Sequence, residues 1–195
     1  FSLALLTVIV TAALAFIWDA LRGTPENRLG RVGMTVAALL YSALPPAFII
    51  HIRALPDGLL WMLLIFALTW GTDTLAYMGG RLWGKHLLAP KISPKKTVEG
   101  AITGVVGGFI LGLITIIGGQ KTTPILIFLV LIAPPLAVMG DLFESRLKRY
   151  FHVGDSHLTG FNIIPGHGGV LDRTDALIWV VTLFYIYFLL SGAGV

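Results

Sequence analysis

The chain contains no cysteine, and only 12% of its 195 residues are charged. The absence of cysteine excludes disulfides, thiolate metal sites and cysteine nucleophiles. The scarcity of charge excludes a water-soluble domain of ordinary composition, in which about 25% of residues are charged. The sequence also has no GxxxxGK[ST] pattern, which excludes a Walker-type nucleotide loop.

Hydrophobic residues make up 56% of the chain and gather in long runs. A helix needs roughly 20 mostly apolar residues to cross a bilayer. The segments that qualify or come close are 1–17, 32–52, 59–78, 98–117, 124–145 and 171–190. We therefore predict an all-α fold, a polytopic transmembrane helix bundle with about six spans. It would form one integral membrane domain over residues 1–195, with no soluble domain.

The first apolar segment is short, and the chain begins with Phe1 instead of Met. A cleaved signal peptide is the alternative, but the segment lacks a basic n-region and a convincing small-x-small cleavage site. We expect residues 1–17 to be the remainder of a span, and the chain to be the C-terminal part of a longer protein.

Positive charge is distributed unevenly along the chain. All but two of the 14 Lys and Arg residues lie in the connectors 19–31, 79–97 and 146–173, and the exceptions are Arg53 and Lys121. These three connectors alternate with the others, so they share one side of the membrane. The positive-inside rule makes that side cytoplasmic. This placement accounts for the net charge of +4 without a nucleic-acid partner.

Half of the acidic residues lie within or at the edge of apolar runs. They are Asp73, Asp141, Glu144, Asp172 and Asp175. An ionisable group at membrane depth costs several kcal/mol unless it is paired or hydrated, which makes each of these a candidate functional residue.

Two pairs of these acids are spaced three residues apart, namely Asp141 with Glu144 and Asp172 with Asp175. Residues at this spacing share a helix face, so each pair directs two carboxylates the same way. Hard oxygen ligands without cysteine suit Mg²⁺. The alternative, which the spacing leaves open, is a helix-end ion pair with Arg146 or Arg173.

Basic and hydroxyl side chains accompany the acids on the same side. The stretch 91–97 precedes one span, and the stretch 145–149 follows another. Mixed acids and cations at one membrane face suit a site for a metal and a polyphosphate. Attraction to anionic lipid is the simpler reading of the lysines. The sequence Gly166-His-Gly-Gly169 could present backbone N–H groups to an anion.

Taken together, these segments resemble the phosphatidate cytidylyltransferase (CDP-diacylglycerol synthase) family. The strongest match is Ser145-Arg-Leu-Lys-Arg149 followed by Pro165-Gly-His-Gly-Gly-Val-Leu-Asp-Arg-Thr-Asp175. Gly140-Asp-Leu-Phe-Glu-Ser145 and the region from Asp73 to Gly100 also agree. The chain departs from the family at Gly154, where Lys is usual, and in a longer stretch between Asp155 and Pro165.

The resemblance implies cytidylyl transfer from CTP to phosphatidic acid, giving CDP-diacylglycerol and pyrophosphate in phospholipid biosynthesis, at a bacterial inner (plasma) membrane. Its implied metal is Mg²⁺, with a second cation left open. The implied metal ligands are Asp141, Asp172, Glu144, Asp175 and Asp73. The implied catalytic residues are Asp141, Asp172, Lys148, Arg149, His167 and Arg173. The implied substrate-binding residues are Ser93, Lys95, Lys96, Thr97, Ser145, Gly168 and Gly169.

Other functions fit part of this pattern. A CTP-dependent polyprenol kinase or a CDP-archaeol-type synthase would also need a cation site and basic connectors. A transporter would place its acids near the bilayer midplane. A structural membrane subunit would not need the ordered polar blocks. Small residues at 104, 107, 108 and 112 allow close helix packing, either within the chain or in a homodimer.

Overall fold

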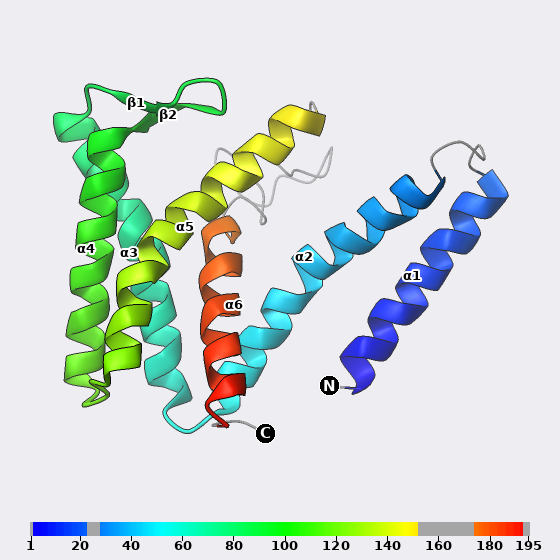
Figure 1. The fold of residues 1–195 in the computed structure, drawn as a ribbon, viewed down its shortest axis with the longest axis horizontal. Coiled ribbons are helices and arrows are strands. Elements are labelled where there is room, and N and C mark those ends of the chain that lie inside the picture. Colours follow the sequence, from blue (N-terminus) through cyan, green and yellow to red (C-terminus); the bar gives the residue numbers. More distant parts are fainter. Residues whose placement is uncertain (1, 23–27, 152–173, 193–195) are drawn as a thin grey trace, which may run out of the picture. The chain divides into compact units, whose positions relative to one another are not determined.

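The computed structural model describes residues 2–22, 28–151 and 174–192 (Figure 1). Its helices are α1 (Ser2–Arg22), α2 (Arg28–Ala54), α3 (Gly58–Trp83), α4 (Val98–Gly118), α5 (Pro124–Phe151) and α6 (Asp175–Leu190). Two short strands, β1 (Leu87–Ala89) and β2 (Ser93–Thr97), lie between α3 and α4. The chain divides into two compact units, residues 1–51 and 52–195.

Four helical segments of the described residues are long and apolar enough to cross a membrane. They are Gly30–Ala54, Gly58–Trp83, Val98–Gly118 and Pro124–Phe151. Ile9–Leu21 and Asp175–Leu190 are shorter apolar helices. The helices coincide with the six predicted segments, which confirms an all-α, polytopic membrane protein. The predicted single domain over residues 1–195 stays a prediction.

Two predicted boundaries are clearly different. Helix α3 continues through Trp83 where the sequence suggested an end at residue 78, and α5 continues through Phe151 where it suggested an end near residue 145. The added turns of α5 carry Lys148 and Arg149. Cations in the last turn of a helix interact favourably with the helix dipole. The two basic residues thus extend the apolar span as a polar helix end.

In the second unit, α3, α4, α5 and α6 pack in alternating directions (Figure 1). Fully buried apolar side chains from all four helices form the core, among them Leu64, Ile65, Leu68, Ile116, Val130, Val180 and Phe184. The outward side chains are also apolar, as expected for a surface in contact with lipid.

Helix α4 has two contrasting faces. Its glycines at 100, 104, 108 and 112 are buried, whereas Ile102, Val106, Ile110 and Ile114 are exposed. Both sets repeat every four residues and so form stripes along the helix. A Cβ at Gly104 would lie 2.6 Å from the backbone oxygen of Thr72 in α3. The glycines therefore serve close packing within the chain, and the homodimer stays a prediction.

The connector between α3 and α4 forms an antiparallel hairpin, which the sequence did not reveal. Leu87 pairs with Thr97 and Ala89 with Ser93, with an irregular register between the two pairs. Thr97 then caps α4, since its side-chain oxygen accepts a hydrogen bond from Gly100 N at 3.2 Å. The last residue of the hairpin is therefore also the N-cap of α4, so the position of the hairpin fixes the start of this helix.

Glu99 in the first turn of α4 fixes the start of the hairpin. Its carboxylate accepts hydrogen bonds from the backbone N–H groups of Lys85 and His86, at 3.0 and 3.2 Å. The same carboxylate lies 2.6 Å from His86 Nδ1. Hydrogen bonds to an ionised acceptor are stronger than neutral ones. Glu99 therefore ties the end of α3 to the beginning of α4.

The connectors at the opposite end of this unit are also joined. Lys121 Nζ lies 2.6 Å from Asp57 Oδ2, linking the turn before α3 to the turn before α5. This ion pair agrees with the predicted alternation of connectors, since the hairpin lies at the other end of the helices (Figure 1).

The packing of α4 predicts a large effect of added volume at Gly108. A side chain there would meet Thr72 and Pro134. We expect Gly108→Val to reduce stability by about 1–3 kcal/mol, as overpacking does in other cores. The measurement is thermal unfolding in detergent. Gly118→Val, where nothing lies within 4 Å of an added Cβ, is the matched control. Equal loss in the two variants would contradict the packing argument.

Candidate functional site

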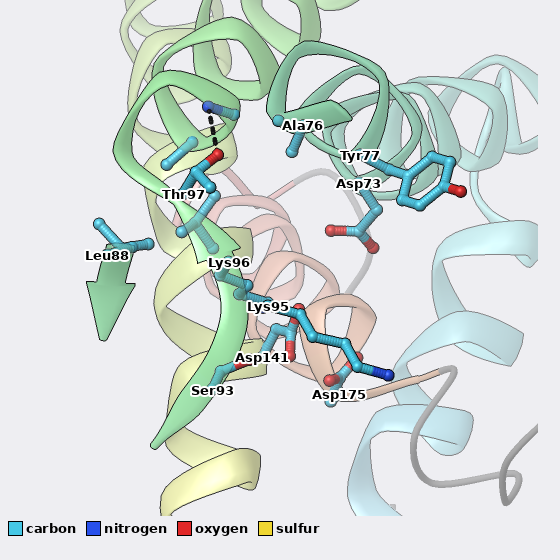
Figure 2. Close-up of a pocket in the computed structure, with 14 residues that line it drawn as sticks. Asp73, Ala76, Tyr77, Leu88, Ser93, Lys95, Lys96, Thr97, Asp141 and Asp175 are labelled. Atoms are coloured by element: carbon cyan, nitrogen blue, oxygen red, sulfur yellow. Dashed lines mark hydrogen bonds and ion pairs between the residues drawn. The ribbon is translucent and has the colours of Figure 1, made fainter. Parts of the chain in front are cut away.

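A pocket of about 440 Å³ lies between the hairpin and helices α3, α4, α5 and α6 (Figure 2). Its charged and hydroxyl lining consists of Asp73, Ser93, Lys95, Lys96, Thr97, Asp141 and Asp175. Alanine, glycine, leucine and valine residues and Tyr77 complete the wall. The pocket therefore combines acids from three helices with cations from the hairpin.

Each acid reaches the pocket from a different helix. Asp73 comes from α3, Asp141 from α5, and Asp175 from the first turn of α6. Asp175 is 6% exposed, and its carboxylate accepts a hydrogen bond from Ala176 N at 2.7 Å. Asp73 and Asp141 are half-buried. Like charges held this close repel unless cations or protons balance them.

Glu144 extends the acid cluster along α5. Its side chain is buried and lies one turn beyond Asp141 on the same helix. Lys148, four residues further on, lies 3.3 Å from the carboxylate of Glu144. We define the acid cluster as Asp73, Asp141, Glu144 and Asp175.

Lys96 is the basic residue most closely associated with the acid cluster. Its ammonium forms an ion pair with Asp141. Burial lowers the pKa of Lys96 below its ordinary value, and the charges of Asp73, Asp175 and Glu144 oppose that shift. Figure 2 shows Lys95 and Lys96 extending from β2 into the space that Asp73, Asp141 and Asp175 frame.

The irregular register of the hairpin explains how two consecutive lysines line one pocket. In a regular strand, adjacent side chains point to opposite faces. Between the pairs Leu87–Thr97 and Ala89–Ser93, β2 contains two more residues than β1. Such irregularities redirect side chains. Arg149 of α5 supports the hairpin from outside, because its Nε donates to Ile92 O at 3.4 Å.

The structure brings most of the described site predictions together. Of the residues singled out by sequence, Asp73, Ser93, Lys95, Lys96, Thr97, Asp141 and Asp175 line the pocket. Glu144 and Lys148 adjoin it, whereas Arg149 contacts the hairpin and Ser145 is half-buried outside the lining. The predictions for Asp172, His167, Gly168, Gly169 and Arg173 lie outside the described residues.

The sequence analysis did not identify two residues that contribute to this region. Tyr77 lines the pocket one turn after Asp73, and this four-residue spacing was the available signal. Glu99 holds the hairpin, and its signal was an acid in the first turn of a helix after a threonine cap.

The acid cluster has the donor chemistry of a Mg²⁺ site, namely several hard carboxylate oxygens. Within residues 2–22, 28–151 and 174–192, however, no three acidic or histidine side chains are arranged to hold a metal ion by themselves. The carboxylates are instead grouped around the ammonium of Lys96.

Known proteins with similar sequences agree on one family. The profile of the cytidylyltransferase family matches residues 1–191. A phosphatidate cytidylyltransferase of Bacillus subtilis is 41% identical over 164 residues, which cover 82% of this chain and 58% of the relative.

Two further relatives have the same name. The protein of Haemophilus influenzae is 42% identical over 139 residues, covering 67% of this chain and 46% of the relative. The protein of Staphylococcus saprophyticus is 35% identical over 176 residues, covering 89% of this chain and 66% of the relative. The chain thus spans between 46% and 66% of the length of these three relatives. The match over residues 1–191 shows that this chain belongs to the cytidylyltransferase family.

Proposed function

We propose that the chain carries the site for cytidylyl transfer from CTP to phosphatidic acid, which yields CDP-diacylglycerol and pyrophosphate. Relatives named phosphatidate cytidylyltransferase support this assignment. The observation that carries it is the pocket itself, in which acids from three membrane helices face two lysines from a hairpin.

The location of the pocket suits one water-soluble and one membrane-bound substrate. CTP arrives from water, whereas phosphatidic acid stays in the bilayer, so their reaction requires a site at the membrane boundary. The acids lie in the half of the helices nearer the hairpin, next to the hairpin lysines. A transporter site near the bilayer midplane would not need this placement.

In the proposed reaction, an oxygen of the lipid phosphate attacks the α-phosphorus of CTP. The new oxygen–phosphorus bond forms as the bond to pyrophosphate breaks, and the electron pair leaves with pyrophosphate. Because the nucleophile is already an anion, general-base catalysis contributes little. Positioning of the two phosphates and neutralisation of their charge are the main requirements. Lys95 and Lys96 are placed to supply positive charge.

Mg²⁺ is the metal that the acid cluster favours, since its four members offer only hard oxygens. Asp141 and Asp172 would hold it, with Asp73, Glu144 and Asp175 as further ligands or as hydrogen-bond partners of the ligands. When bound, Mg²⁺ supplies charge neutralisation at phosphate oxygens. A second cation is compatible with the same acids.

We assign the remaining residues the roles that the resemblance to the family implies. Lys148, Arg149 and Arg173 would neutralise phosphate groups, with Ser145 nearby. His167, Gly168 and Gly169 would lie against a phosphate. Arg149 would have to leave Ile92 O, its partner in the structure, to act in this way.

An assay that follows cytidine-labelled CTP distinguishes cytidylyl transfer from the polyprenol kinase reaction. The complete protein in detergent would receive CTP labelled in the cytidine, Mg²⁺, and either phosphatidic acid or a polyprenol. Cytidine label in lipid with pyrophosphate release, both dependent on phosphatidic acid, is the expected result. CDP release with phosphorylated polyprenol would assign a kinase instead. No product from folded protein would reject both enzymes.

Asp141→Asn should abolish turnover while the protein still folds. The substitution removes the charge that pairs with Lys96 and the proposed metal ligand, so we expect a loss of at least about a hundredfold in kcat. Asp57→Asn is the matched control, because Asp57 also pairs with a lysine but at the opposite end. Near-normal turnover by Asp141→Asn would reject its assignment as a metal ligand.

We also propose that the pocket faces the cytoplasm, because the lysines of the hairpin and the basic last turn of α5 lie on its side of the helices. The absence of cysteine permits a direct test. Lys91→Cys in the hairpin and Thr122→Cys in the opposite connector would each introduce one exposed thiol. In intact cells, a membrane-impermeant maleimide should label only Thr122→Cys, and both after permeabilisation. Labelling of Lys91→Cys alone would reverse the orientation.

A further inference from the structure

The position of Lys96 is unusual among the cations of the described chain. It comes from the hairpin, yet its ammonium contacts Asp141 of α5 and is attracted electrostatically by Asp73 of α3 and Asp175 of α6. Its side chain is 29% exposed and that of Asp141 is 26% exposed. Lys96 thus joins three helices through charge.

The acid cluster requires such a cation. Four carboxylates from three helices repel one another, and burial makes that repulsion stronger than in water. Lys148 pairs with Glu144, and both belong to α5, so this ion pair does not link α5 to another helix. Among the ion pairs of the described residues, the pair of Lys96 with Asp141 links α5 to the hairpin, and the charges of Asp73 and Asp175 extend this link to α3 and α6.

We infer that Lys96 is an internal counter-ion that occupies the cation position of the acid cluster before a divalent metal binds. Lys96 has to release Asp141 when that carboxylate binds a metal. The released ammonium then becomes available to a phosphate group. This inference rests on the proposed function, because it takes Asp141 as a metal ligand and CTP as the source of phosphate.

Charge makes the two states mutually exclusive. An ammonium and a divalent cation at the same carboxylate repel each other, so Lys96 competes with the metal. The phosphates of a nucleotide offer Lys96 a new anionic partner and remove that competition. Nucleotide should therefore strengthen metal binding, and metal should strengthen nucleotide binding by the same factor.

The hairpin makes this exchange mechanically simple. Lys96 has a flexible four-carbon stem, and its neighbour Thr97 is held by the cap of α4. Rotation of the side chain alone can separate the ammonium from Asp141. Helix α4 and the paired strands can keep their positions while Lys96 changes partner.

Binding of Mn²⁺, followed by electron paramagnetic resonance, tests the inference without turnover. The purified chain in detergent would be titrated with Mn²⁺, with and without CTP and in the absence of lipid. We expect Lys96→Gln to bind Mn²⁺ alone at least about fivefold more tightly than the wild type. The enhancement of Mn²⁺ affinity by CTP should fall by a similar factor.

Lys95→Gln is the matched control, because it removes the same charge from the adjacent residue of the same pocket. Lys95 has no ion pair within 4 Å among the described residues. Its substitution should change Mn²⁺ affinity by less than roughly twofold, since an exposed charge is screened by salt. Lys96→Met, which keeps an apolar stem, replaces Lys96→Gln if the latter does not fold.

Unchanged or weaker Mn²⁺ binding by the Lys96 variants overturns the inference, and so does an equal gain in Lys95→Gln. Neither result affects the proposed function if the wild type still binds Mn²⁺ with CTP. A wild type that binds no Mn²⁺ under either condition overturns the metal assignment and this inference together. Normal cytidylyl transfer would then separate the reaction from the metal.

Discussion

The arrangement of the pocket depends on the balance of charge between the acid cluster and the lysine that the hairpin supplies. The four carboxylates come from helices whose other surfaces are apolar. Such helices pack readily along their lengths, but their acidic ends repel. The ion pair of Lys96 with Asp141 offsets that repulsion at the point where three helices approach one another. The hairpin lies outside the spans, but the charge of Lys96 attaches it to the helix bundle.

The close packing of α4 against α3 fixes the position of the hairpin that supplies Lys96. Buried glycines let the backbone of α4 approach α3 closely, while its exposed face carries β-branched residues toward lipid. Because α4 presents glycines to α3, the two closely packed helices hold the two ends of the hairpin connector at a fixed separation. Glu99 and Thr97 then fix the direction in which the connector enters α4. Close packing in the membrane and placement of charge outside it are therefore consequences of the same helix.

The sequence predicted much of this molecule because the underlying signals are local. Length and hydropathy identified the spans, and acids such as Asp73 stood out against apolar neighbours. Spacing placed Asp141 and Glu144 on one face, and the structure keeps both at the acid cluster. The order of the polar blocks resembled a known family, and the match over residues 1–191 supports that resemblance.

What the sequence missed depends on contacts between distant segments. The hairpin joins strands too short to give a periodic pattern, and Lys96 meets Asp141 across 45 residues. A second example is Arg149, which the motif assigns to phosphate but which contacts Ile92 O in the hairpin. Residue type predicted the chemistry of these groups, whereas their partners depend on how the helices bring the segments together.

The irregular register of β2 has a consequence for how this protein tolerates change. Lys95 and Lys96 are chemically identical, and only the backbone decides which of them meets Asp141. Loss of one residue between the paired positions would preserve the composition almost entirely, yet it would turn a different side chain toward the acids. For this connector, the spacing of residues is under tighter constraint than their identity, so insertions and deletions are more damaging than most substitutions.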